Sequence, residues 1–178
     1  MMRGLVLSCI GALVLSACGE RPAVTKVSDD PFISAPSQMA TNIVVTFSDS
    51  SFVKARLYAS VGRILEQQQQ TTMSGPVTVD FFDRDNRDPV ARLTSDSCLV
   101  DDRTRNMTAL GNVVVTSLRR DLVLRTTKLS WLQSTQRIRS DESVTIETAH
   151  ERIDGVGFES NQDLTSYRLA RVRGVQRK

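Results

Sequence analysis

Apolar and polar residues alternate through most of the chain beyond residue 40. Ile43, Val45 and Phe47 occupy every second position, and the ranges 77–81 and 144–147 repeat this pattern. Because successive side chains of a strand point to opposite faces, a period of two is typical of half-buried strands. Polar, turn-forming clusters separate these runs at residues 83–88, 101–106, 117–121 and 133–136. The pattern predicts an all-β domain folded as an antiparallel meander.

The segment 51–70 fits two kinds of element. Its apolar residues include several at helical spacing, yet Val53, Ala55 and Leu57 also alternate with longer or polar neighbours, as in a strand. We favour strands, because the remainder of the domain alternates so consistently. Residues 67–70, a run of glutamines, then form a polar turn or an exposed strand end.

A short internal repeat is present in the predicted domain. Each copy begins a β run after a polar turn and a short segment, and the copies start 36 and 31 residues apart. The copies are Gly75-Pro76-Val77, Gly111-Asn112-Val113 and Glu142-Ser143-Val144. A hairpin-sized unit cannot bury its apolar face alone, so such units stack on their neighbours. The repeat predicts a continuous ribbon of antiparallel hairpins with an apolar interior.

The first residues have the features of a secretory signal. Arg3 supplies a positive charge, residues 5–15 form an apolar run, and Leu15-Ser16-Ala17-Cys18 matches the bacterial lipobox, whose cysteine is acylated after cleavage. The apolar run is shorter than the roughly 20 residues that a membrane-spanning helix needs. Residues that follow are rich in Pro, Ser, Ala and Asp, as in a tether. We expect a signal peptide over 1–17, a lipid anchor at Cys18, a flexible tether over 18–40 and one folded domain over 41–178.

The sequence lacks the groups that an enzyme or a metal site requires. Cys98 remains after Cys9 leaves with the signal and Cys18 takes the lipid, so an intramolecular disulfide is excluded. We expect Cys98 to be a small buried residue. His150 is the single histidine, and there is no Cys/His cluster with metal spacing, no Gly-x-Ser-x-Gly motif and no phosphate loop. We therefore expect no enzyme activity, no metal and no cofactor.

The charge balance does not indicate a nucleic-acid partner. The chain has 23 basic and 20 acidic residues, and the expected cleavage removes only Arg3. Basic residues gather at the end of the chain, at Arg168, Arg171, Arg173, Arg177 and Lys178. Such a tail marks a solvated terminus, or it faces anionic lipid or phosphate.

Several short motifs follow one another over residues 75–174. They are Pro89-Val90-Ala91-Arg92-Leu93, the stretch from Met107 to Val115, Ile138-Arg139-Ser140-Asp141 with Val144-Thr145-Ile146, and Gly155-Val156-Gly157-Phe158 followed by Asp163-Leu164. In order and spacing they resemble the LptC/OstA-like family. The resemblance implies a single twisted, open β-jellyroll whose apolar groove receives lipopolysaccharide from an inner-membrane ABC transporter and passes it to an LptA-like periplasmic bridge protein.

The same resemblance implies a position at the periplasmic face of the inner membrane of a Gram-negative bacterium. This chain departs from many members of the family in its anchor, because they carry an N-terminal transmembrane helix where this sequence has a lipobox. The departure puts in doubt any role that needs a helix inserted into the transporter. It does not affect a transfer role of the sheet.

The candidate groove consists of the apolar residues that the alternation places on the inner face. Acyl chains would gain about 25 cal/mol for each Å² of apolar surface removed from water there; the alternative is that these side chains only pack on one another. The residues are Val77, Val79, Phe81, Leu93, Val113, Val115, Leu124, Leu129, Trp131, Val144 and Ile146. Gly155 and Gly157, with Phe158 as an apolar plug, predict either a bulge where two backbones approach or an opening of the groove.

The open edges of the sheet are candidate docking sites, because unpaired strand edges aggregate or are used for strand addition. The range 164–172 has the composition of a final strand, with apolar contacts from Leu164, Tyr167, Leu169 and Val172. The resemblance makes this edge the side of the bridge protein and the strand at 43–47 the side of the transporter.

Two other classes of function stay open. One is a structural envelope lipoprotein that docks partners through its sheet edges and binds no lipid. The other is a small lipid-modifying enzyme, for which the required catalytic groups are lacking.

Overall fold

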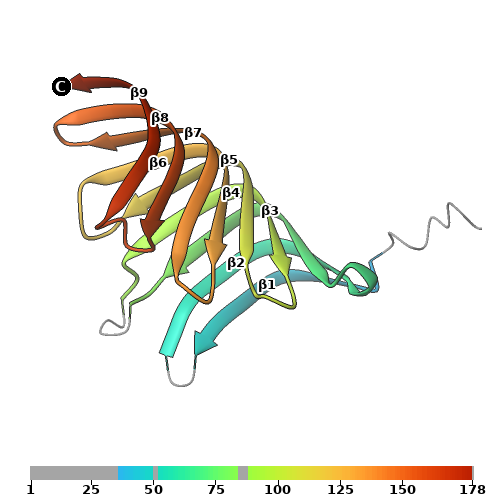
Figure 1. The fold of residues 1–178 in the computed structure, drawn as a ribbon. Coiled ribbons are helices and arrows are strands. Elements are labelled where there is room, and N and C mark those ends of the chain that lie inside the picture. Colours follow the sequence, from blue (N-terminus) through green and yellow to red (C-terminus); the bar gives the residue numbers. More distant parts are fainter. Residues whose placement is uncertain (1–35, 50–51, 84–87, 178) are drawn as a thin grey trace, which may run out of the picture. The chain divides into compact units, whose positions relative to one another are not determined.

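The computed structural model describes residues 36–49, 52–83 and 88–177. Within them, nine antiparallel strands form one sheet in which each strand pairs with its neighbours in the sequence (Figure 1). The described chain has no α-helix, and the predicted open, all-β jellyroll is confirmed. The elements are β1 (Gln38–Asp49), β2 (Phe52–Leu65), the 3-10 helix η1 (Glu66–Gln68), β3 (Gln70–Phe81), β4 (Ala91–Asp101), β5 (Met107–Ser117), β6 (Leu122–Leu132), β7 (Arg137–Thr148), β8 (Glu151–Asn161) and β9 (Tyr167–Arg177).

The ambiguous segment after residue 51 is a strand, as we favoured. In β2 the buried apolar side chains of Ala55, Leu57 and Ala59 are two positions apart and face the interior; Lys54 and Gly62 are buried as well. The run of glutamines forms η1 and ends at Gln69, which has a left-handed φ of 50°. The predicted polar turn between two strands is therefore confirmed.

The internal repeat has a different meaning from the one we predicted. The pairing register shifts within residues 74–77 of β3, 110–113 of β5 and 140–143 of β7, which are the places of the three triplets. The prediction that each triplet begins a β run is therefore wrong, because each lies inside a longer strand. Gly75 and Gly111 take φ values of 85° and 75°, which glycine tolerates better than other residues. A β-bulge bends its strand and increases the twist, so the repeat marks bends.

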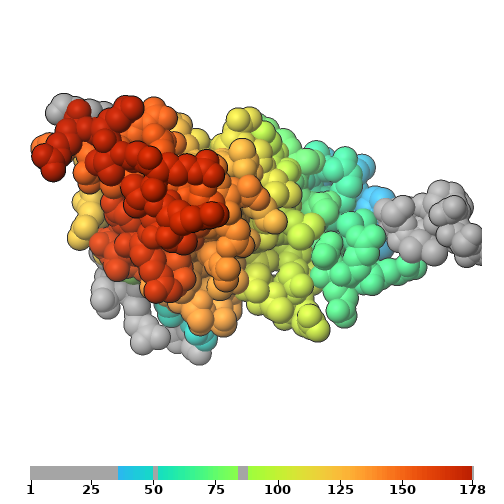
Figure 2. Space-filling view, turned by 45° about the horizontal axis from the view of Figure 1, so that its top comes forward, coloured from blue at the N-terminus to red at the C-terminus, as the bar shows by residue number. Residues whose placement is uncertain are grey.

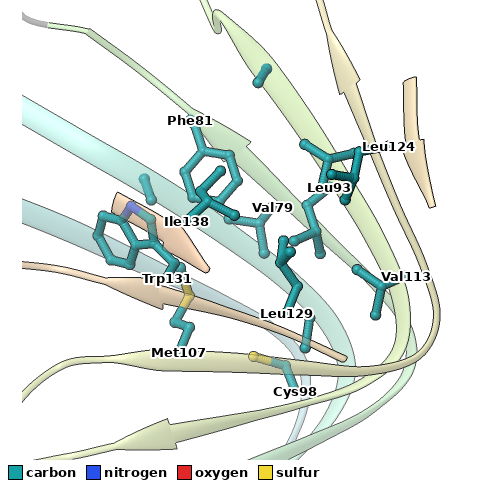
Figure 3. Packing of buried hydrophobic residues seen from close by; sticks show 14 of the residues in the cluster. Val79, Phe81, Leu93, Cys98, Met107, Val113, Leu124, Leu129, Trp131 and Ile138 are labelled. Carbon is teal, nitrogen blue, oxygen red and sulfur yellow. The ribbon is translucent and has the colours of Figure 1, made fainter. Parts of the chain in front are cut away.

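Because the strands bend, their two halves face one another across an apolar interior (Figure 3). In each half, inward-facing residues that pair across neighbouring strands form a row. Each residue of the two rows given next is at most 4% exposed. The first row is Leu57, Val79, Leu93, Val115, Leu124 and Ile146, and the second is Met73, Cys98, Ala109 and Leu129.

Three aromatic side chains join the two halves. The ring of Trp131 in β6 lies 5.5 Å from the ring of Phe47 in β1, edge to face, and 5.8 Å from the ring of Phe81 in β3. Aromatic pairs in such arrangements contribute about 0.5–1.5 kcal/mol beyond the burial of their surface. The contacts fix the N-terminal strands against the middle of the sheet.

The ends of the sheet differ from the predicted boundaries. β1 begins at Gln38, inside the range 18–40 expected to be a tether, and the Ser37 amide donates a hydrogen bond to the carbonyl of Ile64 at 2.9 Å. The last strand starts at Tyr167, so the expectation that Leu164 lies on it is wrong. Leu164 is fully buried in the turn before β9, with a φ of 61°. The Asp163 side chain holds this turn by accepting a hydrogen bond from the Thr165 amide at 3.0 Å.

Candidate functional site

The predicted groove residues all lie together in the buried interior. They come from β3 to β7, belong to one apolar cluster, and are at most 3% exposed. The set is Val77, Val79, Phe81, Leu93, Val113, Val115, Leu124, Leu129, Trp131, Val144 and Ile146. In this structure these residues pack within the protein's own apolar cluster. Their contact with a lipid is therefore still a prediction.

Trp131 places one polar atom in this apolar interior. Its indole Nε1 is buried and has no hydrogen-bond partner among the described residues. A buried donor without an acceptor costs about 1–3 kcal/mol. The indole N–H is therefore available to an acceptor that enters the interior.

A set of hydrogen bonds, which we call the polar seam, closes the side of the interior. The start of β2 and the turns after β3 and β5 lie at one end of the strands, and the turns after β6 and β8 lie at the other. The seam joins these two ends because the bent sheet brings them together. Its bonds run from Gln162 Nε2 to the Phe82 carbonyl, from Ser117 Oγ to the Asp163 carbonyl (3.1 Å), from Arg120 Nη1 to the Thr165 carbonyl (3.2 Å) and from Lys54 Nζ to the Gln133 carbonyl (3.5 Å).

The N-terminal end of the interior, which we call the N-terminal mouth, is not covered by the seam. A pocket of about 380 Å³ lies between β1 and the neighbouring strands, with Ile43, Val45 and Val100 in its wall. Phe47 and Met73 belong both to this pocket and to the buried cluster, so the pocket is continuous with the interior. These residues fit an apolar ligand that enters at β1.

Charged side chains lie at the rim of the N-terminal mouth. Asp102 and Arg105 line the pocket from the turn between β4 and β5. The Asp102 carboxylate accepts hydrogen bonds from Thr71 Oγ1 at 3.0 and 3.1 Å. Arg105 is exposed, so its guanidinium can meet an anionic group attached to an apolar ligand.

The glycines of β8 lie where two backbones approach closely. A Cβ atom on Gly155 would be 2.7 Å from the carbonyl oxygen of Arg171, and Gly157 has a φ of 74°. Phe158 is buried and stacks on Tyr167 with 6.0 Å between the rings. The predicted bulge and close approach are present, whereas an opening at this place stays a prediction.

The C-terminal strand β9 carries inward-facing apolar residues that are partly or largely exposed to solvent. Tyr167 and Leu169 are half-buried and pack against the interior. Val172 lies opposite Gly155 and is 57% exposed, and Val175 lies opposite Ile153 and is 54% exposed. The alternation signals Val172 and the run Ile43, Val45 and Phe47, but it misses Val175 and the rest of the pocket wall, such as Met73 and Val100.

The described residues offer no group of three or more His, Cys, Asp or Glu side chains that could hold a metal ion. Burial raises the pKa of the Cys98 thiol to about 12, which leaves it protonated and unreactive at neutral pH. His150 is exposed in the turn between β7 and β8. Among the described residues no helix is long and apolar enough to span a membrane.

Fold and site define a class of protein: an open antiparallel β-jellyroll with an apolar interior that continues into a pocket at its N-terminal end. The chain belongs to the family described as "Lipopolysaccharide-assembly, LptC-related", whose model matches residues 5–176. The family takes part in lipopolysaccharide transport with other components of the export complex, on the periplasmic side of the inner membrane, and is not a known enzyme family. No curated protein sequence matches the chain.

Proposed function

We propose that this protein is a lipid relay. It receives lipopolysaccharide from the inner-membrane ABC transporter at the N-terminal mouth, holds the acyl chains in the interior, and passes them to an LptA-like bridge protein at β9. Cys18 and the signal peptide lie outside the described residues, and the proposal includes a lipid anchor at Cys18.

The observation that carries this proposal is an apolar row that crosses all nine strands. The row described above for β2 to β7 extends through Val45 on β1, Ile153 on β8 and Val175 on β9. Its middle members are buried, while Val175 at its end is exposed. Apolar surface that runs without interruption from one open edge to the other gives acyl chains a favourable environment along the whole path.

The two ends of the row differ in a way that supports one direction of transfer. The N-terminal mouth has a pocket and the Arg105 guanidinium, which suit the acyl chains and the anionic groups of an incoming lipid. Both β1 and β9 are open strand edges, and the pocket marks the β1 edge, so we assign strand addition by a partner of like fold to the β9 edge. We therefore assign arrival to β1 and departure to β9.

A photoreactive amino acid placed at inward and outward positions of each edge strand tests the relay. The inward positions are Ile43 on β1 and Val172 on β9, and the matched outward positions are Thr46 and Ala170 on the same strands. We expect crosslinks to lipopolysaccharide at both inward positions in cells with an active transporter, and none at the outward positions.

One observation favours the structural envelope lipoprotein instead. The middle of the interior is filled by its own side chains, so a lipid has to displace them or separate the two halves. If neither inward position is crosslinked to lipid in folded variants, the relay is wrong and this second function remains.

A further inference from the structure

The indole of Trp131 carries a polar atom that has no partner in the described protein. Its Nε1 is one of two buried side-chain N or O atoms without a hydrogen-bond partner among the described residues; the other is Gln162 Oε1, an acceptor in the polar seam. The Gln162 side chain is still held through its amide nitrogen, which donates to the Phe82 carbonyl, whereas the Trp131 side chain forms no hydrogen bond. Because a buried indole N–H usually finds an acceptor, an unpaired one points to an acceptor from outside the protein.

Apolar side chains pack around the indole. The rings of Phe47 and Phe81 lie 5.5 and 5.8 Å from its ring, and its register partners are Met107 on β5 and Ile138 on β7. All four are at most 3% exposed. In Figure 3 the indole nitrogen, in blue, is the only nitrogen or oxygen atom among the side chains drawn. An ordered water needs roughly two to four polar partners, so a water does not suit this place.

The indole lies in the same inward row as part of the wall of the N-terminal mouth. From β2 to β6 this row is Ile64, Thr71, Val100, Met107 and Trp131. The first three line the pocket of the mouth, and Phe47, which contacts the indole edge to face, lines it as well. Figure 2 shows the strands in sequence order across the surface, and Trp131, which is 2% exposed, is hidden beneath it. An acyl chain that enters at the mouth and follows the row therefore reaches the indole N–H after Met107.

We propose that Trp131 recognises the acyl chains of the bound lipid. Its indole N–H donates a hydrogen bond to a neutral oxygen on the chain, which is an ester or amide carbonyl or a hydroxyl. A charged oxygen does not fit, because an ion without a counter-ion is far more costly to bury in apolar surroundings. The inference rests on the proposed function and narrows the ligand to lipids whose chains carry such an oxygen away from the charged headgroup. Lipopolysaccharide meets this condition through the hydroxyl and acyloxy groups of its chains, and a plain hydrocarbon chain does not.

NMR tests the hydrogen bond directly. Trp131 is the single tryptophan of the sequence, so the ¹⁵N-labelled full chain gives one indole N–H signal. The probes are methyl decanoate and dodecane, two chains of equal length of which only the first has a carbonyl. We expect methyl decanoate to move the indole proton downfield, as hydrogen bonding does. Dodecane should not move it downfield.

A second measurement removes the N–H while it keeps the shape of the side chain. Because the tryptophan is single, growth on benzothienylalanine replaces Trp131 alone by an isostere without the N–H, and growth on 4-fluorotryptophan gives the matched control that keeps it. We expect the isostere to bind methyl decanoate and lipopolysaccharide on the order of tenfold more weakly, as loss of one buried hydrogen bond does. Binding of dodecane should be unchanged. Binding of short-chain phosphatidylglycerol should also be unchanged, because its ester oxygens adjoin an anionic headgroup.

The other outcomes contradict different statements. Equal affinity of the native chain and the isostere for methyl decanoate, with lipopolysaccharide still bound, overturns the hydrogen bond and leaves the relay in place. An indole proton that is already downfield in the free protein, and moves back in Gln162→Leu, assigns the N–H to the Gln162 side-chain oxygen and also overturns the inference. Weaker binding of phosphatidylglycerol alone overturns the assignment of the oxygen to lipopolysaccharide. Failure of the native chain to bind lipopolysaccharide contradicts the proposed function itself, and the inference with it.

Discussion

Cys98 shows what this interior does to a reactive group. Its thiol is almost fully buried in β4, beside Met73 and Ala109 in the second row. Desolvation is the main cause of its raised pKa of about 12, and a backbone hydrogen bond involving Thr108 acts weakly in the other direction. The thiolate is the form that reacts with disulfide reagents. Reactivity of this thiol therefore reports whether the interior is closed.

A chain in which Cys9 and Cys18 are replaced by serine carries Cys98 as its single thiol. At pH 8, well below the raised pKa, the thiol should be almost entirely protonated, so the folded protein should react very slowly with an aromatic disulfide reagent. Unfolding in urea should bring the rate to that of an ordinary thiol. Fast reaction of the folded protein would show that the interior opens to solvent at rest.

Cys18 is the residue on which membrane attachment depends in our proposal. Its replacement by alanine should abolish incorporation of a palmitate analogue during growth and leave the signal peptide uncleaved by the lipoprotein peptidase, because both steps need the cysteine. In-gel detection of the label, with Cys98→Ala as the control, checks this. Equal labelling of the native chain and the Cys18 variant would contradict acylation at this residue.

The pairing of β8 with β9 depends on a glycine. An added Cβ at Gly155 would meet the Arg171 carbonyl at 2.7 Å and the Leu169 side chain at 3.3 Å, so the backbones must move apart. Gly155→Ala should lower the free energy of unfolding by about 1–3 kcal/mol, as forced overpacking does. Gly174→Ala is the control, because nothing lies within 4 Å of its Cβ and changes at such sites stay within about 0.5 kcal/mol. Equal urea midpoints for the two variants would contradict the close approach.

Acid should weaken the attachment of β9. The pKa of the Glu159 carboxyl is lowered, first by the hydrogen bond from Arg168 and then by the one from Arg137. A lowered pKa in the folded state gives stability that is present above the ordinary value of about 4.3 and is lost as the pH falls through the folded value. Hydrogen exchange of β9 amides should therefore rise on acidification, and less so in Glu159→Gln, which lacks the titration. A variant at the exposed Glu142 should keep the native profile.

Strand content was visible in the sequence because alternation is a local property. The bends were misread for a physical reason: a bulge inserts one residue, which shifts the alternation at Gly75 and makes the second half of the strand look like a new one. The burial of Leu164 was hidden as well, because it results from a turn that side chains hold. The strand at 43–47 was predicted to face the transporter, but the pocket beside it was not predicted, because the seam that leaves it uncovered joins residues such as Phe82 and Gln162, which are 80 positions apart.

At the scale of the whole molecule, the two open edges should serve different partners. A chain that ends at Ala170 loses the half of β9 that bears Val172 and Val175 but keeps the buried Leu164. It should no longer copurify with the bridge protein, while its association with the transporter persists. A chain that ends at Gln176 is the control and should bind both. Normal copurification of the shorter chain with both partners would show that β9 is not the docking edge.

The bends in mid-strand also give the molecule a mechanical property. Widening a closed barrel must break hydrogen bonds of its ladder, since every strand is held from both sides. Here the ladder hydrogen bonds lie on either side of bends such as those at Gly75, Gly111 and Gly157, so a change in dihedral angles there increases the angle between the halves while each half keeps its pairing. Such an opening breaks the contacts of the polar seam. The paired halves of the described sheet are thus stiff, and the sheet deforms at the bends between them. One set of strands can therefore enclose ligands of different cross-section.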